Sequence, residues 1–411
     1  MRCGLIGERL GHSFSAEIHE KLGRYEYELI ELSPGELEHF FRRRDFDGIN
    51  VTIPYKRAVM AYLDGMSERA AAIGAVNTVV NRGGKLWGDN TDFGGLEALV
   101  RRSGFDLRGA EVLIAGSGGT SRTAEAVARS LGAKQTMRLS RSGRDGAVTY
   151  EAAYERHAGA QYLINTTPAG MYPDLDGCSV DLDRLTGLRG VVDAVYNPLT
   201  TRLVRAARAR GIPAEGGLFM LTAQAVASAE DFCGERVTPE TTERLYREML
   251  FEKRSIVLIG MPGCGKTTLG ALLARQMGRE LVDTDAETAC RAGMSIPEIF
   301  RQRGEACFRT LESETIRAVS RTGGRVIATG GGAALRQENV DALKQNGVVV
   351  FLDRPLAQLH PTDDRPLADS EEKLRRLYEE RRPAYAAAAD VTVPVYGTPE
   401  ETAEKLMEML K

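Results

Sequence analysis

Short apolar runs rich in β-branched residues alternate along this chain with glycine-rich turns and segments of helical pattern. EVLIAG (111–116) leads to a helix-like segment from Thr120 to Leu131, and SIVLIG (255–260) leads to another from Lys266 to Met277. Strands that alternate with helices are typical of βαβ units and parallel sheets. The pattern therefore predicts an α/β protein with two such sheets, each opening with a phosphate-type loop.

A helix is expected to join the two sheets. Thr238, Pro239 and Glu240 give a helix start, with an N-cap residue, proline at the first helical position and an acid in the first turn. The helical pattern runs to about Glu252, and a strand begins at Ser255 with no Gly/Ser-rich spacer between them. We therefore expect a short connection that lets the two halves move little.

Composition narrows the class of protein. The 411 residues suggest two to three domains, and 54 basic against 57 acidic residues give a net charge of −3, which argues against a dedicated nucleic-acid binder. No apolar run is long enough to span a membrane, and the N-terminus has no signal-peptide core. The six cysteines form no C-x-x-C pair, as expected of thiols in a reducing cytosol. We expect a cytoplasmic protein without nucleic-acid or membrane partners, either monomer or homodimer.

The first glycine-rich loop, Gly116 to Arg122, lies between a strand and a helix, where backbone N–H groups can bind a pyrophosphate. Ser121 replaces the third glycine of G-x-G-x-x-G, so the motif depends on this context. The next strand, QTMRL, ends in SRSGR without a carboxylate, and its two arginines suit a phosphate. This favours NADP(H) over NAD(H); the alternative is that both arginines are solvated loop residues.

Polar clusters precede this loop within about 95 residues: GHSFSAEIH (11–19), NVTIPYK (50–56), GAVNT (74–78) and GDNTD (88–92). Small hydroxyls and amides suit a polyhydroxy acid, and a lysine and an aspartate can share a proton at a carbonyl or an alcohol. Each cluster is ordinary by itself. Together, at the strand ends of one domain, they indicate a site.

The second loop, GMPGCGKT (260–267), follows a strand and fits the P-loop pattern. Its N–H groups cradle phosphates, Lys266 reaches the β and γ oxygens, and the Thr267 hydroxyl binds Mg²⁺. In LVDTDAE (281–287), Asp283 and Asp285 are expected to share one face of an extended strand, where they could hold hydrated Mg²⁺ and orient an acceptor hydroxyl.

Three further features follow the P-loop. Arg309 and Glu312 are spaced to pair on a helix, although a solvated surface pair is the alternative. IATGGGA (327–333) ends a strand in three glycines, which close approach of a ligand explains best. VVVFLD (348–353) resembles a Walker-B strand, but Asp283 already fills that role.

Residues 1–250 resemble shikimate dehydrogenase, in the order HS-x-S, NVTIPYK, GAVNT, GDNTD, G-x-GG, NTTPAGM, VYNP and MLTAQA. The family reduces 3-dehydroshikimate reversibly to shikimate. The resemblance implies a shikimate site lined by Ser13, Ser15, Asn50, Thr52, Asn77, Asp92, Tyr196 and Gln224, with Lys56 and Asp92 as the catalytic pair. It implies that NADP is held by Gly116, Ser117, Gly118, Gly119, Ser140, Arg141, Arg144, Thr166 and Met171.

Residues 254–411 resemble shikimate kinase through GMPGCGKTT, D-x-D, GE-x-x-FR-x-x-E, TGGGA and RPL. AQLHPTDD (357–364), before RPL, lacks the further arginine that this family's lids often carry, so adenine contacts are expected to differ. The resemblance implies that the nucleotide is bound by Gly260, Pro262, Gly263, Cys264, Gly265, Lys266, Thr267 and Thr268, and Mg²⁺ by Thr267 and Asp283. It implies that shikimate is bound by Asp285, Arg309, Gly330, Gly331, Gly332 and Arg381, with Lys266, Asp285 and the lid residue Arg365 catalytic.

Together the resemblances imply a bifunctional enzyme that makes shikimate with NADPH and then phosphorylates it with ATP and Mg²⁺. We expect a substrate-binding domain at 1–95 completed by helices at about 217–252, a Rossmann-type NADP domain at 96–216, and a P-loop domain like that of nucleoside monophosphate kinases at 254–411. Two alternatives stay open. The P-loop domain could bind nucleotide only to regulate the dehydrogenase, or the dehydrogenase could be a catabolic quinate/shikimate enzyme.

Overall fold

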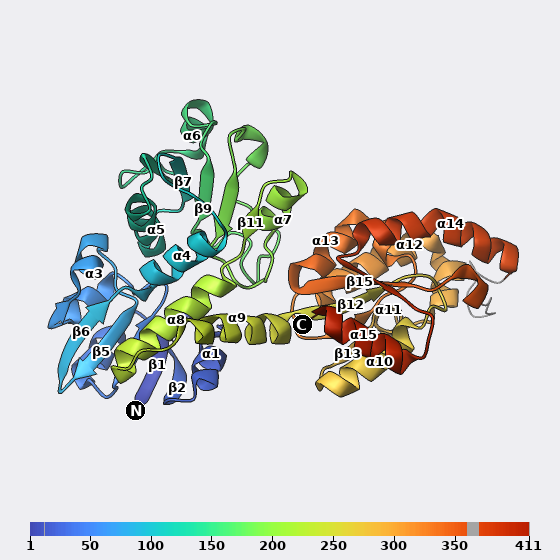
Figure 1. Cartoon of the computed structure of the whole chain (residues 1–411), viewed down its shortest axis with the longest axis horizontal. Helices are drawn as coiled ribbons and strands as arrows, with labels where there is room; N and C mark the ends of the chain where they lie inside the picture. The colour runs from blue at the N-terminus through green and yellow to red at the C-terminus, as the bar shows by residue number, and fades with distance from the viewer. Residues whose placement is uncertain (12, 360–369, 411) are drawn as a thin grey trace. The chain divides into compact units, whose positions relative to one another are not determined.

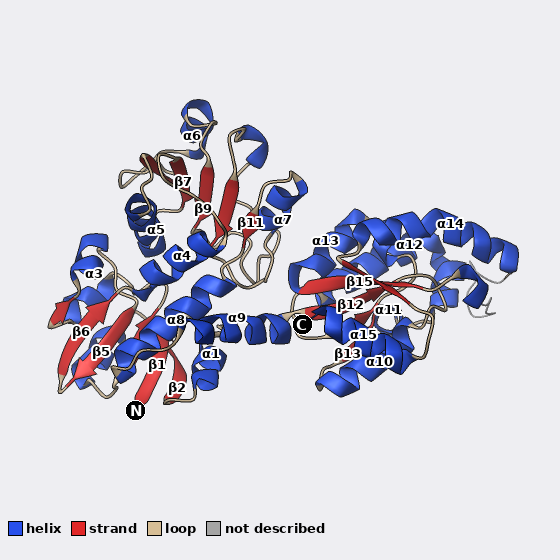
Figure 2. Ribbon diagram, viewed as in Figure 1, coloured by secondary structure: helices blue, strands red, loops and turns tan. Residues whose placement is uncertain are grey.

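The computed structural model describes residues 1–11, 13–359 and 370–410, and among them three β-sheets form (Figures 1 and 2). The chain divides into two compact units, Met1–Met249 and Leu250–Lys411. Helix α9 (Pro239–Lys253) begins at the predicted proline and runs across this boundary. In the described part of the chain, no helix is both long enough and apolar enough to cross a membrane.

The first sheet of the first unit is mixed, whereas the repeating pattern had suggested parallel sheets only. Strand β1 is parallel to β2 and β3, but β5 is antiparallel to both β3 and β6. The β5–β6 pair is antiparallel because only the short turn at Gly83-Gly84 separates the two strands. The strand order is β2 (Glu26–Glu31), β1 (Arg2–Gly7), β3 (Gly48–Val51), β5 (Thr78–Arg82), β6 (Lys85–Asp89) and β4 (Gly65–Met66), with helices α1 (Ser15–Leu22), α2 (Leu37–Arg43) and α3 (Glu68–Ile73).

The second sheet is parallel throughout, as predicted, and its first strand and helix lie where the sequence placed them. The expected helix at 120–131 begins one residue earlier, at Gly119. The strand order is β11 (Ala214–Glu215), β10 (Gly190–Asp193), β9 (Tyr162–Asn165), β7 (Glu111–Ala115) and β8 (Gln135–Leu139), with helices α5 (Gly119–Ser130), α6 (Tyr150–Arg156) and α7 (Arg202–Ala209).

Two helices connect these sheets within the first unit. Helix α4 (Thr91–Arg102) contacts α5 of the second sheet, and α8 (Leu218–Cys233) contacts α1 and β5 of the first (Figure 1). They touch each other at Gly95, where an added Cβ would lie 2.7 Å from the Met220 carbonyl oxygen. The missing side chain lets the two helices approach closely.

The second unit holds the third sheet, which is also parallel. Helix α10 occupies Lys266–Met277, as predicted. The strand order is β13 (Leu281–Asp283), β14 (Val326–Ala328), β12 (Ser255–Ile259), β15 (Gly347–Asp353) and β16 (Val391–Pro394), with helices α11 (Thr284–Ala292), α12 (Ile296–Val319), α13 (Gln337–Asn346), α14 (Glu371–Ala388) and α15 (Pro399–Leu410). Apolar side chains from both faces of this sheet form one buried cluster.

Substitutions of two adjacent glycines of α4 should change the stability of the first unit in opposite directions and so test the helix contact. Gly95→Ala should destabilise the first unit by about 1–3 kcal/mol, because the new methyl overlaps the α8 backbone. Gly94→Ala meets open space and should stabilise it by about 0.5–1 kcal/mol. Trp87, the single tryptophan, lies in this unit, so its fluorescence during urea unfolding measures both stability changes. Equal effects of the two substitutions would contradict this packing.

Candidate functional site

A lysine and a buried aspartate form the centre of the first candidate site. The Lys56 ammonium contacts the Asp92 carboxylate with Nζ 2.6 Å from Oδ2, and Asp92 is 3% exposed. Asn90 caps α4 by accepting from the Phe93 N–H, which places Asp92 in the first turn of the helix. A carboxylate is stabilised there by the N-terminal end of the helix dipole.

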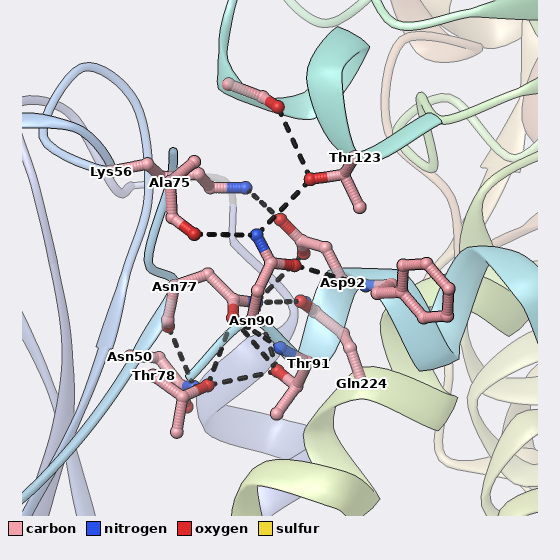
Figure 3. A network of polar contacts seen from close by, with 12 residues as sticks. Asn50, Lys56, Ala75, Asn77, Thr78, Asn90, Thr91, Asp92, Thr123 and Gln224 are labelled. Carbon is pink, nitrogen blue, oxygen red and sulfur yellow. Dashed lines mark hydrogen bonds and ion pairs between the residues drawn. The ribbon is translucent and has the colours of Figure 1, made fainter. Parts of the chain in front are cut away.

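The amide of Asn77 fixes the other oxygen of this carboxylate. Asn77 donates through Nδ2 to Asp92 Oδ1 at 3.0 Å and to Gln224 Oε1 at 3.0 Å (Figure 3). Its own Oδ1 accepts from the Thr91 N–H at 2.7 Å, so the amide cannot flip without losing these bonds. The fold thus brings together four of the predicted residues. Lys56 lies on the loop after β3, Asn77 directly before β5, Asp92 on α4 and Gln224 on α8.

Asn50 lies beside this group, but its amide is engaged within the protein. Asn50 Oδ1 accepts from the Tyr27 hydroxyl at 2.7 Å, and Nδ2 donates to Ser228 Oγ at 2.8 Å and to Thr78 Oγ1 at 3.1 Å. Thr78, Thr91 and Ser228 also bond to one another through their hydroxyls. The sequence reasoning missed this network, although Ser228 follows Gln224 by one helical turn and the spacing could have revealed it.

The serine motif forms a second polar group. Ser13 Oγ lies 3.1 Å from Ser15 Oγ, and the Tyr196 hydroxyl forms a hydrogen bond with Ser13, while burial raises the pKa of Tyr196. The Phe14 and Tyr196 rings pack with their centroids 5.3 Å apart. Thr52, the remaining predicted residue, is half-buried just after β3.

The first glycine-rich loop lies next to the Lys–Asp pair. Gly116 has a φ of +125°, and an added Cβ would meet the Thr166 hydroxyl, which donates to the Ala115 carbonyl at 2.7 Å. Ser121 turns its hydroxyl back to the Gly118 carbonyl at 2.7 Å, so this serine fits where the motif has glycine. An added Cβ at Gly119 would lie 3.6 Å from Lys56 Cβ, which brings the loop against the lysine.

The end of β8 completes the cofactor region. The buried Ser140 hydroxyl accepts from the Gly143 N–H at 3.0 Å, which shapes the turn after the strand. Arg141 and Arg144 are exposed on this turn, and Met171 is 39% exposed on the loop after β9. Open glycine backbone at Gly118 and cationic side chains fit a dinucleotide that carries an additional phosphate.

The P-loop in the second unit has the expected backbone. Gly260, Gly263 and Gly265 have φ values of +143°, +80° and +97°, which favour glycine. The buried Lys266 ammonium donates to the carbonyls of Gly260 at 3.0 Å and Met261 at 2.9 Å. Cys264 is buried, and its sulfur lies 3.0 Å from the position of a Cβ at Gly260.

Asp283 and Asp285 lie together for a reason other than the predicted one. Strand β13 ends at Asp283, and Asp285 lies in the first turn of α11, so the extended-strand expectation was wrong. Asp283 caps this helix, with Oδ1 accepting from the Asp285 N–H at 3.0 Å, while Oδ2 accepts from the Thr267 hydroxyl at 2.9 Å. Hydroxyl and carboxylate oxygens of this kind fit Mg²⁺ beside a phosphate chain.

A pocket of about 660 Å³ opens at this edge of the third sheet. Burial, and then the charges of Glu312 and Asp283, raise the pKa of Asp285 to about 6, against the opposing effect of Lys266 and Arg309. The predicted residues that line the pocket are Pro262, Gly263, Gly265, Lys266, Thr267, Thr268, Asp283, Asp285, Arg309, Gly330, Gly331, Gly332 and Arg381. Arg365 lies outside the described residues.

Glu312 is a pocket residue that the sequence reasoning identified only as a helix partner. The predicted pair is confirmed, with Arg309 Nη1 2.9 Å from Glu312 Oε2, and Glu305 binds the same guanidinium at 3.0 Å. Glu312 is buried, and its Oε1 has no hydrogen-bond partner among the described residues. Phe300 and Phe308 pack nearby with centroids 4.9 Å apart and line the same pocket.

The three consecutive glycines make room for the pocket's own side chains. An added Cβ at Gly330 would meet Asp285 Oδ1, and one at Gly332 would meet the Arg309 guanidinium. Arg381 donates to the Gly331 carbonyl at 3.0 Å. The neighbouring Arg382 instead pairs with Asp353 at 2.7 Å, outside the pocket.

Comparison with known proteins identifies relatives of each unit. Residues 5–79 match the family model described as the shikimate dehydrogenase substrate binding domain, and residues 262–411 match the model described as shikimate kinase. A shikimate dehydrogenase (NADP(+)) of Clostridium perfringens is 35% identical over 272 residues, covering 60% of this chain and 97% of the relative.

Solved structures match the first unit as well. Shikimate 5-dehydrogenase from Thermus thermophilus in complex with NADP(H) and shikimate is 31% identical, with a TM-score of 0.53, covering 60% of this chain and 99% of that one. A chorismate mutase/shikimate 5-dehydrogenase fusion protein from Clostridium acetobutylicum is 32% identical, with a TM-score of 0.56, covering 60% and 96%.

The electrostatic coupling of Asp285 to Glu312 can be measured directly. Glu312→Gln removes the largest charge effect on Asp285, so the pKa of Asp285 should fall below its value of about 6. Carboxyl ¹³C shifts of labelled aspartate, followed from pH 4 to 8, report this pKa. Glu314→Gln changes an exposed residue two positions along the same helix and should leave the pKa of Asp285 unchanged. If the pKa of Asp285 were the same in Glu312→Gln as in the wild type, the two carboxylates would not be coupled.

Proposed function

The chain belongs to the shikimate dehydrogenase family through its first unit, and we propose that the residues of this site reduce 3-dehydroshikimate with NADPH. The second unit is a shikimate kinase domain that phosphorylates the shikimate so formed, using ATP. The chain is thus a bifunctional enzyme of the shikimate pathway. The observation that carries the proposal is shared by both units: a glycine-rich nucleotide loop lies beside a buried carboxylate and a cation.

In the first site, Lys56 is the proton donor. NADPH bound along Gly116–Gly119 would supply the hydride to the ketone carbon. The Lys56 ammonium then protonates the oxygen that becomes the hydroxyl, and Asp92 holds the ammonium at 2.6 Å. Ser13, Ser15, Thr52, Asn77, Tyr196 and Gln224 are proposed to bind the hydroxyls and carboxylate of the substrate.

Asn50 takes a different role in this proposal from the one implied by the family resemblance. Because its amide is already bonded to Tyr27, Thr78 and Ser228, we assign it to positioning the carbonyl of Asn77, to which Nδ2 also donates at 3.3 Å. Ser140, Arg141 and Arg144 are proposed to bind the additional phosphate of NADPH, with Thr166 and Met171 beside the cofactor.

In the second site, Asp285 is the base. ATP with Mg²⁺, held by the P-loop with Thr267 and Asp283, would supply the phosphoryl group. The Asp285 carboxylate accepts the proton of the shikimate hydroxyl, and a pKa of about 6 keeps it mostly ionised at neutral pH. Arg309 and Arg381 suit the substrate carboxylate because guanidinium forks bind carboxylates bidentately.

A cytoplasmic location is also part of the proposal. The six cysteines are free in the structure, as expected of a reducing compartment. NADPH and ATP as co-substrates fit the same compartment.

The Lys56 assignment has an internal control within the same chain. Lys56→Ala should lower kcat for 3-dehydroshikimate reduction by about 10²–10⁴, with a smaller change in KM, because a positioned proton donor is lost. Shikimate phosphorylation by the second unit should stay at the wild-type rate, which controls for the amount of protein. Urea unfolding followed by Trp87 fluorescence should also match the wild type, which shows that the first unit is folded. Lys85→Ala, at the exposed first residue of strand β6, controls for loss of a charge. Near wild-type reduction by Lys56→Ala would refute the assignment.

One coupled assay tests the bifunctional proposal against its alternatives. Incubation with 3-dehydroshikimate, NADPH and Mg-ATP should yield shikimate 3-phosphate and one ADP for each NADPH oxidised. Reduction without release of ADP would favour a purely regulatory nucleotide domain. Comparable turnover of quinate with NAD⁺ would favour a catabolic dehydrogenase, whereas the proposal expects shikimate with NADP⁺ to be much preferred.

A further inference from the structure

Arg354 lies at the edge of the third sheet where the P-loop begins, and the site described above does not use it. It follows the last residue of β15, the strand that pairs in parallel with β12, and β12 leads into the P-loop. The base of the loop packs on the end of β15, because an added Cβ at Gly260 would lie 2.8 Å from the Leu352 carbonyl oxygen. Both chain segments therefore leave the sheet together.

The Arg354 guanidinium reaches the loop itself. Arg354 Nη2 lies 4.0 Å from the position of a Cβ at Gly265, the residue directly before Lys266. Arg354 is held in place by its backbone, whose N–H donates to the Leu352 carbonyl at 3.2 Å. A cation therefore lies at this strand end, beside the last residue of the loop before Lys266.

This cation has no partner in the described part of the chain. Arg354 Nε is buried and makes no hydrogen bond, and no carboxylate of the described residues pairs with the guanidinium. Two other arginines of the second unit do have partners: Arg382 pairs with Asp353, and Arg381 donates to the Gly331 carbonyl. A guanidinium stays charged at any physiological pH, and a buried donor without an acceptor is costly.

We propose that Arg354 is a nucleotide-binding residue that contacts the phosphate chain of ATP and ADP. The inference rests on the proposed kinase function of the second unit. A phosphate oxygen would supply the acceptor that the buried Nε lacks, and the planar guanidinium fork suits phosphate. The alternative, a side chain that only packs its stem under the loop, leaves the buried Nε unexplained.

Calorimetric titration of the full chain with Mg-ADP and with adenosine tests this assignment. Arg354→Gln should weaken ADP binding about 10- to 100-fold, the effect of losing hydrogen bonds between charged groups, while adenosine binding is unchanged. The ADP affinity of Arg354→Lys should lie between those of the wild type and Arg354→Gln. Arg376→Gln removes the same charge from an exposed position of α14 and should match the wild type. The KM for ATP should rise with Arg354→Gln, and the KM for shikimate should not.

Three results would overturn the inference. These are an ADP affinity of Arg354→Gln within twofold of the wild type, an equal loss of adenosine and ADP binding, or a parallel loss of shikimate binding, which would indicate a packing role. A different result would contradict the proposed kinase function of the second unit. A wild-type chain that binds ADP but forms none from ATP and shikimate would lack the kinase activity, while the comparison of affinities would still decide the role of Arg354.

Discussion

A buried carboxylate is costly unless a cation or hydrogen-bond donors pair with it, and this constraint shapes both sites of the chain. Asp92 is held by Lys56 on one oxygen and by the Asn77 amide on the other. Asp285 and Glu312 share a pocket with Lys266 and Arg309. The glycine loops matter because they bring a nucleotide close to these pairs without filling the space.

The surroundings of the carboxylate differ between the two units, and this difference fits the proton transfer proposed for each. In the first, Asp92 contacts the Lys56 ammonium on one oxygen and the neutral Asn77 amide on the other, which holds a proton donor in place. In the second, two acids lie close together, and burial with like charge raises the pKa of Asp285 to about 6. The first arrangement suits protonation of a forming alkoxide, and the second suits removal of a proton from a hydroxyl.

Local signals in the sequence predicted both loops and several element bounds, because strand–turn–helix motifs are contiguous. Helix α10 and strand β8 fall where the patterns placed them. Residues that meet across the fold were harder to predict. Tyr27, Asn50 and Ser228 are far apart in sequence, and only the packing of α8 on the first sheet brings them into one network. Asp285 was expected on a strand because the N-cap role of Asp283 was not recognised.

The central claim is that each unit recognises the same hydroxylated ring acid at its own site. Equilibrium titration of the full chain with shikimate, without nucleotides, tests it most directly. The account predicts two equivalents bound per chain, and one equivalent in an Arg309→Gln variant, whose first site is intact. A single equivalent in the wild type, or two equivalents that survive loss of Arg309, would contradict it.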